Sequence, residues 1–202
     1  MEKREIVYGK LVDTRREVAS VTKTMTAYTV CELARKYDLN LSETYIKVCK
    51  LGSRIIGSSA KLRHNDVLTA EQLLYGLMLP SGNDAAFCLA KYFGKFLFAK
   101  KGYTEHHKKR IRSFEFDEHS SYVKYFLKEM NEIASQLKMA NTNWDSPHGL
   151  TNRENVTTAS DLFKLCEKAM YVPLLREVMA KKVFTCNAMK QDSDGSYVYS
   201  NS

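Results

Sequence analysis

The sequence contains no long apolar run and no leader-like start. No stretch approaches the ~20 apolar residues that a membrane-spanning helix requires. The N-terminal stretch from Met1 to Arg16 is charged throughout and has no apolar signal-peptide core. We therefore expect neither a signal peptide nor a transmembrane segment in this chain, and the sequence leaves its localisation undecided.

Patterns typical of disulfide frameworks and metal sites are also missing. The five cysteines are dispersed, with no Cys-x-x-Cys pair and no cluster with histidine. An odd, scattered set of this kind argues against a disulfide framework and against a zinc site. We expect reduced, mostly buried thiols, no metal and no other cofactor.

The composition is that of a globular domain. Of the 202 residues, 44% are hydrophobic and 27% are charged, which excludes a disordered or fibrous chain. Much of the net charge of +8 comes from a basic stretch at 100–112. Such a stretch can contact nucleic acid, an anionic membrane surface or an acidic polymer, or it can be a solvated loop. Because no nucleic-acid-binding motif accompanies it, we favour the loop and do not expect nucleic acid as a partner.

One serine–lysine pair stands out by its surroundings. Ser20 and Lys23 are three residues apart, so on a helix their side chains lie about 60° apart on one face. The same face continues through Ala27, Val30 and Ala34, and a lysine beside such an apolar stripe is costly unless it has a task. Partial desolvation lowers the pKa of a lysine, so Lys23 is a candidate base for a Ser20 nucleophile.

The spacing of this pair is weak evidence by itself. A Ser-x-x-Lys pattern is expected about once by chance in a chain of this length. Further examples occur at 58–61, 121–124 and 135–138. We interpret these three as serines near helix starts with solvated lysines one turn on. A catalytic role for Ser20 therefore needs evidence from other parts of the sequence.

Periodicity indicates helices in the middle of the chain and strands towards both ends. Apolar residues at helical spacing predict helices at about 20–37, 70–79, 84–97, 121–137 and 159–169. Thr69 with Gln72 has the spacing of a capping box at the second of these starts, and Thr158 with Asp161 predicts a cap at the last. Extended patterns predict strands at 6–10, 43–49, 183–188 and 197–200. This order predicts an α+β domain in which an antiparallel sheet joins the N- and C-terminal segments and packs against the helices.

A second motif follows the predicted helix at 70–79. Ser81-Gly82-Asn83 is the sole Ser-x-Asn in the sequence, and it falls on a turn between two helices. At this turn, Asn83 or Asp84 can cap the next helix, so a helix-capping turn is one interpretation of the motif. Ser81 and Asn83 have a second interpretation. They also place a hydroxyl and an amide where both can project towards the first helix, and a Ser-x-Asn paired with Ser-x-x-Lys is typical of one group of serine enzymes.

The sequences around both motifs resemble those of a known protein family. The segments are 19–27 (ASVTKTMTA), 73–86 (LLYGLMLPSGNDAA), 141–144 (NTNW), 147–150 (PHGL) and the helix start at 158–162 (TASDL). In this order they resemble the D-alanyl-D-alanine carboxypeptidases, the low-molecular-weight penicillin-binding proteins. The resemblance covers about 6–200, apart from the basic stretch.

The resemblance implies a β-lactamase/transpeptidase-like fold and a serine-type D-Ala-D-Ala carboxypeptidase-like hydrolase. Ser20 would form the acyl-enzyme, and Lys23 would be its general base. Ser81 would relay a proton to the leaving group, and Asn83 would hold the substrate amide. The substrate would be a peptide ending in D-Ala-D-Ala, and β-lactams would acylate the same serine as mimics. His148 invites a catalytic-triad interpretation, but the family uses Ser-Lys chemistry, so we expect His148 to structure its loop.

The third motif of the family, Lys-Thr-Gly on a strand after the last helices, does not occur in the sequence. By the resemblance, that strand would supply a binding cation and one backbone N–H of the oxyanion hole. We therefore expect residues 1–202 to form a single partial penicillin-binding or transpeptidase-like domain. Its sheet would be incomplete, and a basic insertion would occupy about 100–118.

Other functions stay open at this point. The missing third motif favours a catalytically impaired relative that binds a peptide, a glycan or a partner protein through the same cleft. A β-lactamase or esterase could use the same scaffold, although the sequences at 81–86 and 148–150 resemble the carboxypeptidases and disfavour both. A nucleic-acid-binding module using 100–112 would lose its affinity steeply with added salt.

Overall fold

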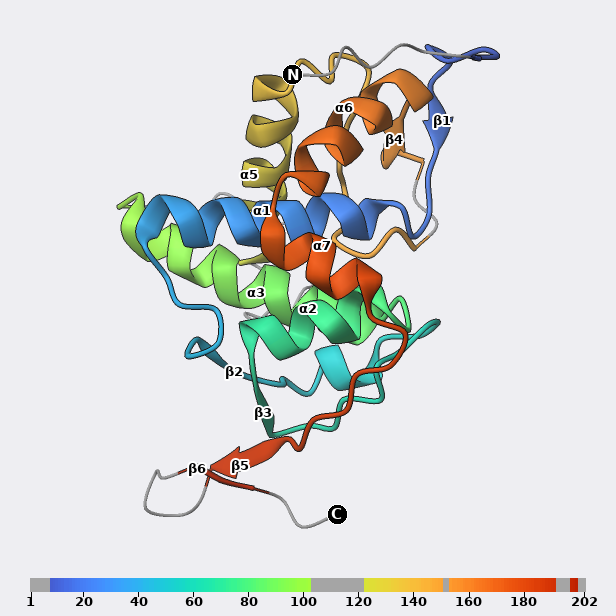
Figure 1. The fold of residues 1–202 in the computed structure, drawn as a ribbon. Helices are drawn as coiled ribbons and strands as arrows, with labels where there is room; N and C mark the ends of the chain where they lie inside the picture. The colour runs from blue at the N-terminus through green and yellow to red at the C-terminus, as the bar shows by residue number, and fades with distance from the viewer. Residues whose placement is uncertain (1–7, 103–121, 151–152, 192–196, 200–202) are drawn as a thin grey trace.

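The computed structural model describes residues 8–102, 122–150, 153–191 and 197–199. The helix α1 crosses the middle of the molecule, with α5 and α6 on one side and α2 and α3 on the other (Figure 1). In chain order the elements are β1 (Arg16–Glu17), α1 (Thr22–Tyr37), β2 (Tyr45–Lys47), the 3-10 turn η1 (Gly52–Arg54), β3 (Asp66–Thr69), α2 (Ala70–Met78), α3 (Asn83–Lys100), α5 (Val123–Gln136), β4 (Val156–Thr157), α6 (Ala159–Met170), α7 (Pro173–Ala180), β5 (Met189–Gln191) and β6 (Tyr197–Tyr199).

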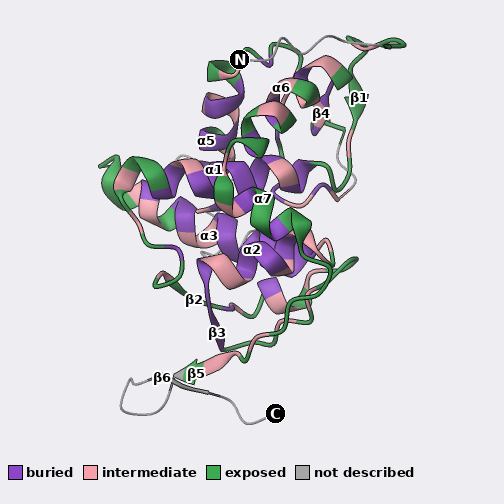
Figure 2. Cartoon of the chain, in the orientation of Figure 1, coloured by how far each residue is buried: buried purple, intermediate pink, exposed green. Residues whose placement is uncertain are grey.

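The core lies where the helices meet around α1. Figure 2 shows α1, α2 and α3 largely in the colour of buried residues. The apolar stripe of α3 is buried as predicted, and it consists of Ala86, Leu89, Ala90, Phe93 and Leu97. Burial of such side chains contributes about 25 cal/mol per Å² of apolar surface, and this burial is what holds short helices in place.

Two helix starts are set by the capping residues that the sequence predicts. Thr69 and Gln72 form a capping box at α2, in which each side chain receives the backbone N–H of the other residue. At α6, the backbone N–H of Asp161 donates to Thr158 Oγ1 over 3.1 Å. The expected capping of α3 by Asn83 or Asp84 is wrong, because Gly82 is its N-cap and makes no side-chain hydrogen bond.

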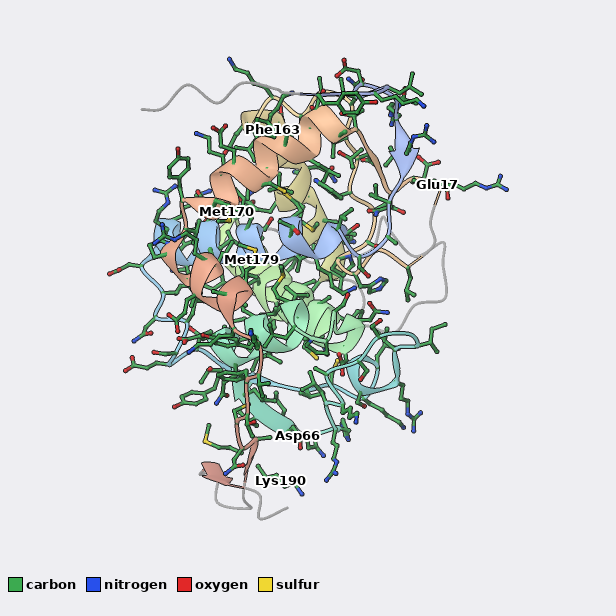
Figure 3. The ribbon with its side chains drawn as sticks, turned by 45° about the vertical axis from the view of Figure 1, so that its right-hand side comes forward. Glu17, Asp66, Phe163, Met170, Met179 and Lys190 are labelled. Carbon is green, nitrogen blue, oxygen red and sulfur yellow. The ribbon has the colours of Figure 1, made fainter. Side chains whose placement is uncertain are left out.

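The main sheet is antiparallel and has the strand order β2-β3-β5-β6. It joins the strand predicted at 43–49 to the C-terminal hairpin, so the α+β class and the antiparallel sheet are confirmed. Asp66 of β3 and Lys190 of β5 are opposite each other in this pairing (Figure 3). A separate two-stranded sheet pairs β1 with β4.

Several predicted boundaries are wrong. The strand expected at 183–188 lies at Met189–Gln191, where Met189 pairs with Val67. The helix α7, which begins at Pro173, was not predicted. The predicted strand at 6–10 falls partly outside the described residues, and its described part, Tyr8–Lys10, is not extended in a sheet. The expected insertion at 100–118 lies almost wholly outside them.

Across the described residues, no helix has both the length and the apolarity needed to span a bilayer. The same residues contain no group of three or more histidine, cysteine, aspartate or glutamate side chains placed to hold a metal ion.

Candidate active site

The structure brings the predicted nucleophile and base into contact. Ser20 lies in the turn that leads into α1 and is exposed, whereas Lys23, in the first turn of α1, is only 2% exposed. Lys23 Nζ donates to Ser20 Oγ over 3.2 Å and to the carbonyl oxygen of His148 over 2.8 Å. An accessible hydroxyl beside a buried amine is one arrangement that can activate a serine as a nucleophile.

Burial changes the acidity of the lysine. Desolvation lowers the pKa of Lys23 from 10.5 to about 8, and the negative charge of Asp84 opposes this shift in part. A lysine with that pKa is partly neutral near pH 7 and can accept a proton. The other described Ser-x-x-Lys pairs, at 58–61 and 135–138, are exposed at both residues. Burial of the amine therefore separates Ser20–Lys23 from them.

The segments 141–150 and 153–155 lie against the start of α1 and are held there by buried polar side chains. Asn155 donates through Nδ2 to the carbonyl oxygen of Val18 and to Thr22 Oγ1, over 3.0 and 2.8 Å. Thr26 Oγ1 donates to the carbonyl oxygen of Pro147 over 2.7 Å. These bonds fix the backbone on both sides of Ser20. They also keep in place the carbonyl of His148, which accepts a hydrogen bond from Lys23.

His148 structures this loop, as expected. Its Nδ1 accepts the backbone N–H of Leu150 over 3.1 Å. Burial, and then the charge of Lys23, lower the pKa of His148 to about 4, so its imidazole is neutral at pH 7. The contribution of this residue to Lys23 is its backbone carbonyl rather than its ring.

Gly149 is required by a close approach of two backbones. It has a φ of +77°, and a Cβ at this position would lie 2.0 Å from the carbonyl oxygen of Ala19. A glycine therefore allows the loop to pass directly over the residue that precedes Ser20.

Replacing Gly149 by alanine is expected to reduce the free energy of unfolding by about 2–4 kcal/mol, because positive φ and the clash both add strain. Gly102→Ala is the matched control, since Gly102 has a φ of +63° with nothing within 4 Å of an added Cβ. Urea unfolding of both variants measures the difference. Equal losses in the two variants would show that the contact with Ala19 is unimportant.

The second predicted pair lies at the junction of α2 and α3. Ser81 has a φ of +57°, a conformation that costs a non-glycine residue energy and that often marks functional sites. Asn83 is the first residue of α3 and is 4% exposed. Its Nδ2 donates to the carbonyl oxygen of Ile56 over 2.8 Å. Among the described residues, neither side chain has a hydrogen bond to Ser20 or Lys23, so their roles stay predictions.

Asp84, which the sequence offers only as a possible helix cap, is a positioning residue. This carboxylate is 2% exposed and accepts hydrogen bonds from Ser59 Oγ and from the backbone N–H groups of Ala60, Leu62 and Ala85, over 2.7–3.1 Å. It therefore holds the loop at 59–62 against the start of α3. Its negative charge also acts on Lys23 and offsets part of the lowering of the Lys23 pKa by burial.

An α+β fold with a serine–lysine pair at the start of its central helix defines the class of β-lactamase/transpeptidase-like serine hydrolases. The chain belongs to the D-alanyl-D-alanine carboxypeptidase family, whose sequence model matches residues 2–105 and 117–202. The unmatched residues, 106–116, fall inside the stretch predicted to be a basic insertion.

Individual relatives agree with this family. The chain is 35% identical over 187 residues to the D-alanyl-D-alanine carboxypeptidase of Streptomyces sp. (strain K15). This alignment covers 91% of this chain and 56% of that protein. It is 24% identical to D-alanyl-D-alanine carboxypeptidase DacF of Bacillus subtilis (strain 168), over 91% of this chain and 43% of that protein. The chain thus spans about half the length of the curated relatives it matches.

Solved structures are similar over most of this chain. The crystal structure of the Streptomyces K15 DD-transpeptidase superposes with a TM-score of 0.74 at 34% sequence identity, covering 96% of this chain and 66% of that chain. The D-alanyl-D-alanine carboxypeptidase DacD from Francisella tularensis gives a TM-score of 0.68 at 29% identity, covering 87% of this chain and 36% of that chain.

Proposed function

We propose that this chain is a serine-type D-Ala-D-Ala carboxypeptidase-like hydrolase that acts through a Ser-Lys acyl-enzyme. The observation that carries the proposal is the hydrogen bond between exposed Ser20 and buried Lys23, in a chain of this family. The substrate is a peptide ending in D-Ala-D-Ala, in keeping with the names of the relatives. A penicillin is expected to acylate the same hydroxyl.

In the first step, the neutral Lys23 amine takes the proton of Ser20 as the hydroxyl attacks the carbonyl of the penultimate D-Ala. The Lys23 N–H that donates to the carbonyl oxygen of His148 holds the amine so that its lone pair can face Oγ. An Oγ–C bond forms, the peptide C–N bond breaks, and D-alanine leaves with a proton. Water then hydrolyses the ester and restores the hydroxyl.

The proposal gives Ser81 and Asn83 the supporting roles. Ser81 relays the proton from Lys23 to the departing amine. Asn83 binds the substrate amide with the second N–H of its side chain and with Oδ1, because one N–H is already used on Ile56. No residue of this chain is assigned the role of the Lys-Thr-Gly motif, which the sequence does not contain.

Acylation is expected to accelerate with rising pH and to level off above about pH 8. Only the neutral amine of Lys23 can accept the Ser20 proton, and burial lowers the pKa of that amine to about 8. Below this value, each pH unit removes about nine-tenths of the neutral amine, so the rate should fall about tenfold per unit. Penicillin acylation rates measured from pH 5.5 to 10 test this, and a rate still rising at pH 10 would contradict a lowered pKa.

The hydrolase proposal is tested by release of D-alanine from a diacylated tripeptide ending in D-Ala-D-Ala. The same peptide ending in L-Ala-L-Ala is the substrate control, and Ser20→Ala is the protein control. Release only from the D-Ala-D-Ala peptide, and only by the unmutated chain, is expected. Binding of the peptide without release by folded protein would overturn the proposal in favour of a catalytically impaired relative.

A further inference from the structure

Two cysteines from different parts of the chain meet beside η1. Cys49 follows β2, and Cys88 lies in α3. A Cβ added to Gly52 would lie 2.7 Å from Cys88 Sγ and 3.4 Å from Cys49 Sγ, so the two sulfur atoms flank the same small space. The two side chains are close enough for each to shift the pKa of the other. Gly52 leaves the room that this contact needs.

The two thiols have opposite environments. The backbone N–H of Gly52 donates to Cys49 Sγ over 3.4 Å, and the Lys91 ammonium lies close enough to interact with the same sulfur. The contact with the Cys88 side chain, followed by the N–H of Gly52 and the charge of Lys91, lowers the pKa of Cys49 against the effect of burial. The contact with Cys49 and burial raise the pKa of Cys88. Cys49 is therefore the member of the pair that loses its proton more readily.

Cys49 is also the accessible member of the pair. It lines a surface hollow of about 520 Å³, whereas Cys88 is 2% exposed. Four basic side chains line the same hollow: Lys47, Lys50, His64 and Lys91. A small polar reagent that enters this hollow therefore meets a thiolate in a basic environment, with a second thiol directly behind it. Low pKa, exposure and a neighbouring thiol are the properties of a redox-reactive cysteine.

The other three cysteines lack this combination. Burial raises the pKa of Cys31 to about 12, and it also raises the pKa of Cys166 and of Cys186. Cys166 is exposed, in contrast to the mostly buried thiols that the sequence predicts, so it provides an accessible reference thiol in the same protein.

We propose that Cys49 and Cys88 form a peroxide-reactive dithiol site. The Cys49 thiolate attacks a hydroperoxide, the O–O bond breaks, and Cys49 becomes a sulfenic acid while the alcohol or water leaves. The Cys88 thiol then attacks the sulfenic sulfur, a disulfide forms and water leaves, so the peroxide is reduced by two electrons. The disulfide would tie the segment after β2 to α3, five residues beyond Asn83. This site is independent of the proposed hydrolase function.

The test treats the full chain with hydrogen peroxide at pH 6 and follows intact mass and peptide maps. The unmutated protein is expected to lose two hydrogen atoms and to yield a Cys49–Cys88 linked peptide. Cys88→Ala is expected to stop at a Cys49 sulfenic acid, which dimedone traps. Cys166→Ala, the matched control, should behave as the unmutated chain.

Rates make the test sharper. The pKa of Cys49 is lowered and that of Cys166 is raised, so at pH 6 a much larger share of Cys49 is thiolate. The lower intrinsic nucleophilicity of a low-pKa thiolate offsets only part of this difference. We expect Cys49 to react at least about tenfold faster than Cys166. Oxidation of Cys166 at the same rate, or a peptide map without the Cys49–Cys88 link, would overturn the proposal. The map of the unmutated protein decides this even if Cys88→Ala does not fold.

Discussion

Replacing Ser20 by alanine is expected to abolish covalent labelling by a fluorescent penicillin. The Ser20 hydroxyl is the only proposed acceptor of the acyl group, and it lies 3.2 Å from the amine that would activate it. The fold should persist, since Ser20 is exposed and precedes the first helical residue of α1. We expect the free energy of unfolding to change by no more than about 0.5 kcal/mol.

Gel fluorescence of the labelled protein measures this effect, with urea unfolding beside it. Ser135→Ala is the matched control, because Ser135 opens another Ser-x-x-Lys pattern in which both residues are exposed. Labelling of Ser20→Ala at the level of the control would mean that a different residue is the nucleophile.

Replacing Lys23 by methionine is expected to slow acylation by about 10²- to 10⁴-fold, the contribution that a positioned general base typically makes. Methionine fills similar space without a lone pair that could accept the Ser20 proton. Stopped-flow kinetics with a chromogenic β-lactam measure the rate, and Lys138→Met, at an exposed turn, is the control. A loss smaller than threefold would exclude Lys23 as the base.

The same substitution should make the protein more stable at pH 7. The pKa of Lys23 is about 8 in the folded chain and 10.5 when unperturbed, so the unfolded chain binds the proton more tightly. This difference destabilises the native state most below pH 8 and disappears as the pH rises towards 10.5. We therefore expect Lys23→Met to gain about 1–2 kcal/mol at pH 7, after loss of the hydrogen bond to His148. Near pH 10.5 the gain disappears and the lost hydrogen bond leaves the variant about 1 kcal/mol less stable.

The helices could largely be predicted from the sequence, because their signals are local. The capping box of Thr69 and Gln72 and the Thr158 cap fix two starts, and the stripe of α3 fixes its buried face. The strand β3 (Asp66–Thr69) was not predicted, because it is short and directly followed by a helix. It is also buried at every position, so its sequence shows no alternation of apolar and polar residues. The position of β5 depends on its pairing with β3, which no local pattern encodes.

The candidate site was predictable in its polar motifs but not in its supports. Ser20 and Lys23 meet as helical spacing predicts. The hydrogen bonds that Asn155 donates and Asp84 accepts connect residues far apart in sequence, so only the folded chain reveals them. One signal was present: Thr22 and Thr26 put hydroxyls one turn apart on a buried face of α1, where each needs a partner. The contact of Cys49 with Cys88 had no such signal.

The most direct test of Ser20 as nucleophile and Lys23 as base is intact-mass spectrometry of the purified chain after incubation with a penicillin, followed by peptide mapping. One added penicilloyl group per chain is expected, located on the peptide that contains Ser20. An adduct on any other residue, or no adduct on protein that circular dichroism shows to be folded, would contradict the Ser20–Lys23 pair as a working nucleophile and base.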